Sequence, residues 1–239
     1  MSRTTRDSIS IRGAGIVEIE QPAKGVRFTL DSLLIADFCR LRPRDKVLEP
    51  GAGTGVISLL LARKHPSARF LAIEEEPHAF DLLCRNIEAN DLVHHITAAN
   101  QDIRRLPHSE IFDAIVANPP YTKAGTGKNS PSVPRRQARH DQSAPLKAWI
   151  DLGSLLKNKG RFFLVFTAAR SGEVITLMRE RHLEPKRIRF VHPSHTKPAS
   201  LVLIEAVAAA APNLEVLPPL VVHGPGNTYS EEMEKIYNL

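Results

Sequence analysis

Cysteine and tryptophan are nearly absent from this chain: its 239 residues include two Cys and one Trp. Cys39 and Cys84 lie far apart and follow neither a metal-ligand nor a redox spacing, so we expect two reduced, buried thiols. No apolar stretch is long enough to span a bilayer, and residues 1–7 lack the apolar segment of a secretory signal. No His and Cys residues are spaced as metal ligands. These absences argue against a membrane protein or a metalloprotein and predict a soluble, cytoplasmic one.

The length and the hydrophobic content of 42% are those of a globular chain with a substantial core. We expect residues 1–30 to form a small N-terminal β-hairpin cap, because short apolar runs alternate there with polar residues and glycines. Residues 31–239 then form the main domain. No internal repeat is visible, and the oligomeric state does not follow from the sequence.

Basic residues outnumber acidic ones, 32 Lys and Arg against 26 Asp and Glu, which gives a formal net charge of +6. Such a surplus favours polyanionic partners. One basic cluster lies in a long segment, residues 122–143, that is rich in Gly, Pro and Ser and is expected to be a loop. Its members are Lys123, Lys128, Arg135, Arg136, Arg139 and His140. We expect this cluster to contact phosphate groups; whether the loop is ordered without a partner does not follow from the sequence.

Strand-like and helix-like segments alternate along the chain. The expected strands are residues 46–49, 68–74, 95–99, 112–117, 161–166, 186–191 and 200–206. The expected helices are residues 31–40, with Asp31 as the N-cap, then 56–64, 78–90, 146–156 and 173–181. This alternation predicts an α/β fold with a mostly parallel, doubly wound sheet.

The tetrapeptide Asn118-Pro119-Pro120-Tyr121 directly follows the apolar run at 112–117. Because neither proline has an amide N–H for the ladder, the strand must end there. Carboxyl ends of strands are where open α/β sheets bind ligands. A side-chain amide, fixed carbonyls and an aromatic ring suit a planar nitrogen, such as an aromatic amine or a carboxamide. The tetrapeptide therefore predicts chemistry on an NH₂ group.

A glycine-rich turn, Glu49–Gly55, lies between an expected strand and an expected helix, where glycines let the backbone approach a ligand closely. Glu74 ends the next strand, 74 − 53 = 21 positions after Gly53, a spacing at which a carboxylate can bind both hydroxyls of a ribose. Glu75 and Glu76 are alternatives for that role. Asp102, after the third strand, either accepts a hydrogen bond from an adenine amine or caps a turn.

These residues resemble the class I methyltransferases that use S-adenosylmethionine. The resemblance implies a Rossmann-like fold, with a seven-stranded, mostly parallel sheet and helices on both faces, and makes residues 31–239 the methyltransferase domain. It implies that the glycine loop wraps the methionine part of the cofactor. The cofactor-binding residues implied in this way are Phe28, Glu49, Gly51, Gly53, Gly55, Glu74, Asp102 and Asn118.

Further segments look like the bacterial tRNA adenine-N6 methyltransferase family, whose known member modifies an adenine beside the anticodon of a valine tRNA. They are Gly25–Leu34, Ala138–Asp141, Val191–Pro193, Pro218–His223, Tyr229–Glu232 and Ile236–Tyr237. The resemblance implies methyl transfer to the N6 amine of an adenine in RNA, an RNA-modification and tRNA-processing function, with Asn118, Pro119 and Tyr121 as the catalytic residues. It leaves the exact nucleotide and RNA open. We expect Lys123, Arg135, Arg136 and Arg139 to bind the RNA.

Other functions compete with this one. A glutamine N5-methyltransferase acting on a protein such as a release factor has the same tetrapeptide, as do cytosine and some guanine amine methyltransferases. The glutamine enzymes typically have a helical domain before the glycine loop, whereas the first 50 residues here look partly β. A nicotinamide-dependent oxidoreductase would have Gly-x-Gly-x-x-Gly and would leave the tetrapeptide unexplained. A catalytically silent RNA-binding module would not need Asn118 and Tyr121.

Overall fold

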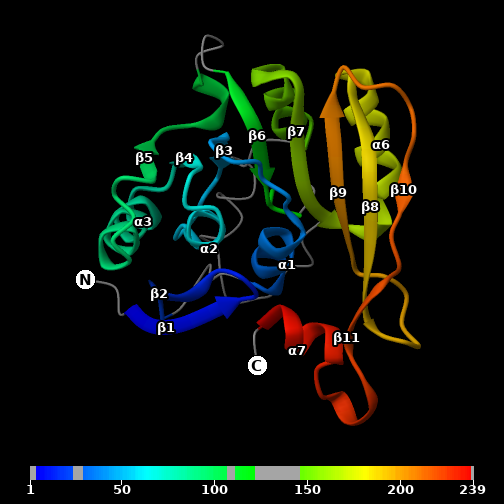
Figure 1. The fold of residues 1–239 in the computed structure, drawn as a ribbon, viewed down its shortest axis with the longest axis horizontal. Helices are drawn as coiled ribbons and strands as arrows, with labels where there is room; N and C mark the ends of the chain where they lie inside the picture. Colours follow the sequence, from blue (N-terminus) through cyan, green and yellow to red (C-terminus); the bar gives the residue numbers. More distant parts are fainter. Residues whose placement is uncertain (1–3, 24–28, 107–110, 122–145, 238–239) are drawn as a thin grey trace, which may run out of the picture.

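The computed structural model describes residues 4–23, 29–106, 111–121 and 146–237 and shows an α/β fold (Figure 1). The strands are β1 (Thr4–Ile11), β2 (Gly15–Pro22), β3 (Lys46–Pro50), β4 (Arg69–Glu74), β5 (Ile96–Asn100), β6 (Phe112–Ala117), β7 (Leu156–Thr167), β8 (Leu183–Ser194), β9 (Leu201–Ala208), β10 (Glu215–Val216) and β11 (Leu220–His223). The α-helices are α1 (Leu30–Phe38), α2 (Val56–Lys64), α3 (Pro77–Ala89), α5 (Leu146–Asp151), α6 (Ser171–Glu180) and α7 (Glu231–Tyr237).

The main sheet has the strand order β10-β8-β9-β7-β6-β3-β4-β5. Neighbours pair in parallel except β9, which is antiparallel to both β7 and β8. The seven strands from β8 to β5 are the expected sheet. The short strands β10 and β11 both pair with β8, which brings the described sheet to nine strands. Sequence analysis missed these two because runs of two and four residues show no usable periodicity.

Both faces of the sheet are covered, which explains why its central strands are continuous apolar runs rather than alternating ones. Along β6, Ala114 and Val116 belong to one hydrophobic cluster, whereas Ile115 and Ala117 belong to a second. The first cluster also contains the buried side chains of α1, α2 and α7, and the second those of α5 and α6. The predicted fold class, with helices on both faces, is therefore confirmed.

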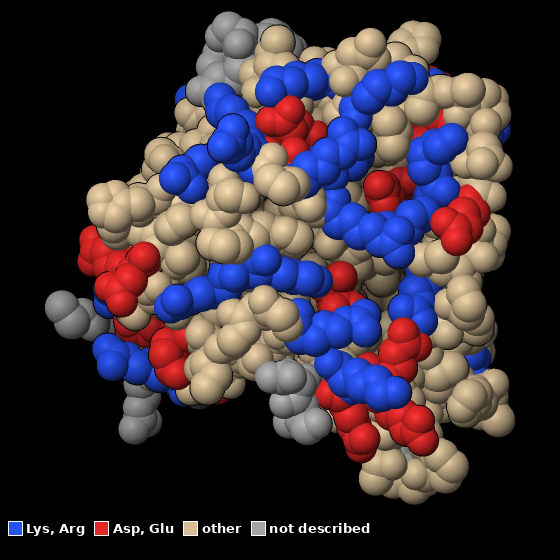
Figure 2. All heavy atoms as spheres, viewed as in Figure 1, with Lys and Arg blue, Asp and Glu red and all other residues tan. Residues whose placement is uncertain are grey.

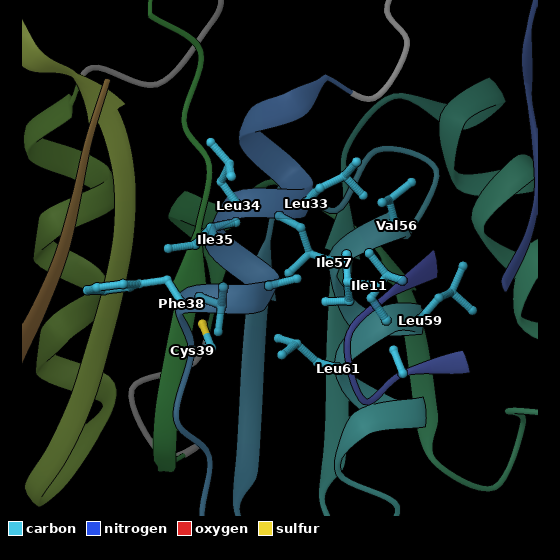
Figure 3. Close-up of a cluster of buried hydrophobic side chains, with 14 of the residues drawn as sticks. Ile11, Leu33, Leu34, Ile35, Phe38, Cys39, Val56, Ile57, Leu59 and Leu61 are labelled. Carbon is cyan, nitrogen blue, oxygen red and sulfur yellow. The ribbon is translucent and has the colours of Figure 1, made fainter. Parts of the chain in front are cut away.

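Helix α1 is held firmly by this packing. Figure 3 shows its buried side chains, among them Leu33 and Phe38, beside those of α2 and beside Ile11 at the end of β1. Leu33 and Ile11 are at most 2% exposed. Burial of a large aliphatic side chain stabilises a fold by about 1.5–3 kcal/mol. The first turn of α1 is therefore presented from a rigid support.

The N-terminal hairpin of β1 and β2 docks onto α3 through two asparagine side chains. Glu20 N donates to Asn86 Oδ1 (2.7 Å) and Asn86 Nδ2 donates back to Glu20 O (2.9 Å). Asn90 exchanges the same pair of bonds with Glu18, at 3.0 and 2.7 Å. Each side-chain amide pairs with the backbone as a neighbouring peptide group would, and so satisfies backbone N–H and C=O groups at the outer edge of β2. The hairpin was expected within residues 1–30, and it runs from Thr4 to Pro22.

Two sequence-based details were wrong. The N-cap of α1 is Thr29, and Asp31 lies inside the first helical turn. Both residue types cap helices, so local sequence does not distinguish the two positions. The expected helix 146–156 ends as α5 at Asp151 and continues as a short 3₁₀ turn, Leu152–Leu155, before β7 begins.

Candidate active site at the carboxyl ends of β3, β4 and β6

The glycine loop, Glu74 and the Asn118–Tyr121 turn follow three neighbouring parallel strands, β3, β4 and β6. The carboxyl ends of parallel strands meet at one edge of the sheet, so these three segments lie at the same edge. A backbone hydrogen bond from Ala52 N to Ile73 O (2.8 Å) continues the pairing of β3 with β4 into the loop.

The three glycines of the loop have different roles. All have positive φ, 63° at Gly51, 58° at Gly53 and 88° at Gly55. A Cβ on Gly51 would lie 2.4 Å from the ring of Trp149, and one on Gly55 would lie 2.4 Å from Leu83 Cδ1. A Cβ on Gly53 would have no atom of the described residues within 4 Å. Gly51 and Gly55 thus permit close packing, whereas Gly53 leaves its backbone open to a ligand.

Glu49 supports the start of α2 from inside the protein. Its side chain is buried, and Oε2 accepts hydrogen bonds from Ser58 N (2.9 Å) and from Ser58 Oγ. Gly55, the N-cap of α2, has no side chain that could accept from the free N–H groups of the first turn. Glu49 accepts from one of them instead, the N–H of Ser58. Burial raises the pKa of Glu49 to about 8, against the lowering effect of the bonds from Ser58. Sequence analysis missed Ser58.

We expect this carboxyl group to make stability fall as the pH rises. Its pKa is about 8 in the folded state, above an unfolded value of about 4.3. The folded protein therefore binds more protons between these values, and the stabilisation present below pH about 4.3 is lost as the pH rises through about 8. In urea unfolding at pH 5, 6, 7 and 8, Glu49→Gln will reduce this fall, whereas the exposed Glu75→Gln will not. Equal slopes in both variants would contradict the assignment.

Three consecutive glutamates follow β4, and the structure separates them. Glu74 Oε2 accepts from Gly53 N (2.7 Å) and Oε1 accepts from Glu76 N (2.9 Å). Burial raises the pKa of Glu74. Glu76 is the N-cap of α3, accepting from Ala79 N (2.7 Å), and the Glu75 side chain is exposed. Glu74 is the one of the three that binds the glycine loop in the described structure.

Asp102 caps a 3₁₀ turn, as one of its two expected roles required. Its Oδ1 accepts from Arg104 N (2.8 Å), and its Oδ2 accepts from Arg104 Nε (2.8 Å). Hydrogen bonding from the Arg104 guanidinium lowers the pKa of Asp102. Contact between Asp102 and an adenine amine stays a prediction.

The Asn118–Tyr121 turn is held from two other elements. Asn118 Nδ2 donates to Ser32 Oγ (3.3 Å) in α1, and Tyr121 Oη donates to Asn118 Oδ1 (2.9 Å). The Tyr121 ring makes an edge-to-face contact with Phe166 of β7, with centroids 5.4 Å apart. Burial, followed by the charge of Asp31 and a hydrogen bond to it, raises the pKa of Tyr121 and keeps the phenol neutral.

Some predicted site residues lie outside the described residues: Phe28, Lys123, Arg135, Arg136 and Arg139. Conversely, Ser32 lies at the site and was missed. The signal was present as a polar pair, Asp31 and Ser32, at the start of an apolar helix, but such a pair is typical of a helix N-terminus. In the described part of the chain, no group of three or more His, Cys, Asp and Glu side chains is arranged to hold a metal ion.

The described geometry combines an open glycine loop, a half-buried carboxylate beside it and an amide turn on the neighbouring strand end. A family model, "Methyltransferase small domain", matches residues 28–136. A tRNA1(Val) (adenine(37)-N6)-methyltransferase of Porphyromonas gingivalis is 31% identical over 198 residues, 72% of this chain and 76% of the relative. One of the same name from Vibrio campbellii is 25% identical over 213 residues, 89% of this chain and 87% of the relative.

Solved structures resemble the fold at lower identity. A predicted O-methyltransferase from Agrobacterium tumefaciens matches with a TM-score of 0.69 at 18% identity, covering 87% of this chain and 96% of that one. The P. horikoshii TYW2 structure in complex with MeSAdo matches with a TM-score of 0.61 at 17% identity, covering 88% of this chain and 74% of that one. At these identities the likeness concerns the fold alone.

Proposed function

Because this chain belongs to the tRNA1(Val) (adenine(37)-N6)-methyltransferase family, we propose that it transfers a methyl group from S-adenosylmethionine to the N6 amine of an adenine in tRNA. The name shared by relatives that are 25–31% identical over most of the chain supports this substrate. It favours adenine over the cytosine, guanine and protein glutamine alternatives. The single observation in the structure that carries the proposal is the Asn118 amide, held at the sheet edge beside the glycine loop.

The residues at this edge fit the cofactor. The space beside Gly53 leaves room for a ligand, and the Glu74 carboxylate, which accepts from Gly53 N, has lone pairs left for the two ribose hydroxyls. Glu49 acts one step away, by fixing the loop to α2 through Ser58. S-adenosylmethionine, when bound, supplies an electrophilic methyl group on a sulfonium sulfur.

The turn prepares the amine. An exocyclic amine donates its lone pair into the purine ring and is a poor nucleophile. Asn118 Oδ1 accepts one bond from Tyr121 and has a second lone pair for an amine hydrogen, and the Pro119 carbonyl is a second acceptor. Such acceptors stabilise positive charge that develops on the nitrogen. Tyr121 stacks on the base and fixes its plane. No strong base is needed, because the methylated ammonium is acidic and loses its proton readily.

The target adenine must leave its stack to reach the turn, which is least costly for a base in a loop. Figure 2 shows many Lys and Arg side chains on one face, in several groups with Asp and Glu side chains among them. In the described part of the chain, several basic side chains are paired with carboxylates: Arg12 pairs with Asp37 at 2.7 Å and Arg189 with Glu232 at 2.7 Å. The phosphate contacts proposed for Lys123, Arg135, Arg136 and Arg139 fall outside the described residues. Within the described ranges, no helix is long and apolar enough to cross a membrane.

Nucleoside mass spectrometry tests the proposed function. Purified protein incubated with S-adenosylmethionine and unmodified valine tRNA will form N6-methyladenosine. The position named in the relatives is adenine 37. The same tRNA with guanine at that position will form none. Cofactor binding in calorimetry without any product on the adenine-containing tRNA would overturn the substrate, and no binding would overturn the enzyme assignment.

A further inference from the structure

We propose that Ser32, in the first turn of α1, is a positioning residue that holds the Asn118 amide ready for the incoming amine. The proposal rests on the function proposed above and adds a residue from an element remote in sequence from the Asn118 turn. Ser32 acts on the substrate only through Asn118.

Ser32 restrains one end of the amide. Its hydroxyl is the acceptor for Asn118 Nδ2 at 3.3 Å, and Ser32 is 7% exposed. A half-buried Asn side chain can rotate about χ1 and χ2. In every orientation except the productive one, its oxygen does not accept a hydrogen bond from the substrate amine. A displacement of about 1 Å at a reacting group lowers a rate about 100-fold. The hydrogen bond from Asn118 to Ser32 on α1 therefore matters more for the rate of methyl transfer than for the stability of the fold.

The other end of the amide is restrained by Tyr121. Its hydroxyl Oη donates to Asn118 Oδ1 at 2.9 Å. The amide oxygen keeps a second lone pair for a hydrogen of the amine. Ser32 and Tyr121 therefore fix the two ends of the Asn118 amide without blocking its acceptor.

Both neighbours of the turn are fixed independently of substrate. α1 is anchored by the cluster drawn in Figure 3, and Tyr121 is braced by Phe166. The first turn of α1 thus contacts the Asn118 turn through Ser32, and the N-cap of the helix is a different residue, Thr29.

The test measures kcat, KM and cofactor affinity of the full chain on valine tRNA. Ser32→Ala will lower kcat about tenfold, the effect of about one hydrogen bond, with KM and cofactor affinity within twofold of wild type. Ser10→Ala is the matched control, since its hydroxyl oxygen is buried and has no hydrogen-bond partner among the described residues. It will leave kcat unchanged.

A double-mutant cycle tests whether Ser32 acts through Asn118. The double variant of Ser32→Ala and Asn118→Ala will be no slower than Asn118→Ala alone, because both changes act through one amide. Asp37→Asn, at the far end of α1, removes contacts with Arg12 and Lys64 and will affect stability without lowering kcat. Wild-type rates in Ser32→Ala, or additive losses in the cycle, would overturn the inference. A wild-type protein that makes no N6-methyladenosine would instead overturn the proposed function.

Discussion

Replacing Asn118 with Ala will reduce methyl transfer by about 10²–10³-fold and will leave the affinity for S-adenosylmethionine within about threefold of wild type. The amide oxygen is one of the two acceptors proposed for the amine, and it accepts a hydrogen bond from Tyr121 Oη at 2.9 Å. Its removal takes away stabilisation that is needed only as charge develops on the nitrogen, so kcat falls more than binding. Single-turnover methylation and titration calorimetry measure the two effects separately.

Asn118→Asp provides the matched comparison. It keeps an acceptor oxygen at the same place but replaces the Nδ2 donor to Ser32. We expect it to retain more activity than the Ala variant, because the Ser32 hydroxyl can donate to the new carboxylate oxygen and keep the restraint from α1. Thermal unfolding checks that both variants are folded. An Ala variant that keeps more than a tenth of the wild-type rate would remove Asn118 from the catalytic role.

The second large effect is expected at Glu74. Glu74→Gln will raise the dissociation constant of S-adenosylmethionine about 10- to 100-fold, since hydrogen bonds to a charged group contribute about 1.5–3 kcal/mol. The new NH₂ group must also face the N–H of Gly53 or of Glu76, the two donors that the carboxylate now satisfies. Calorimetry with the cofactor measures the change directly.

Two adjacent glutamates make this test selective. Glu75→Gln alters an exposed side chain and will leave cofactor affinity unchanged. Glu76→Gln removes a charge from the N-cap of α3 and will lower stability by about 0.3–1 kcal/mol with little effect on affinity. If Glu75→Gln or Glu76→Gln lost cofactor affinity and Glu74→Gln did not, the assignment of the ribose contact to Glu74 would be wrong.

Much of the fold was predictable because its signals are local. The apolar run at 112–117 and the two prolines after it place β6 and its end at the observed residues. The glycine loop and α2 follow β3 as expected, because glycine provides the positive φ that the turn needs. The seven strands from β8 to β5 form the mostly parallel sheet that the resemblance to class I methyltransferases implies.

The roles of polar residues were harder to predict, because a carboxylate or hydroxyl takes its role from whatever lies opposite. Glu49 is buried against Ser58, a partner that the sequence did not indicate, and its expected contact with the cofactor stays a prediction. Asp31 was expected to cap α1, but the cap is Thr29 and Asp31 lies inside the first turn. Periodicity in the sequence does not reveal such contacts, because they depend on the path of the chain between helices and strands.

The sequence by itself determined the order of strands and helices, the point where β6 stops and the kind of chemistry that an Asn-Pro-Pro-Tyr turn supports. These follow from backbone geometry and apolar periodicity over a few neighbouring residues. Only the tertiary structure decided which glutamate meets the glycine loop and that Ser32, 86 positions before Asn118, holds its amide. Such contacts depend on the packing of α1 and of parallel strands against one another, and that packing is set by the whole core.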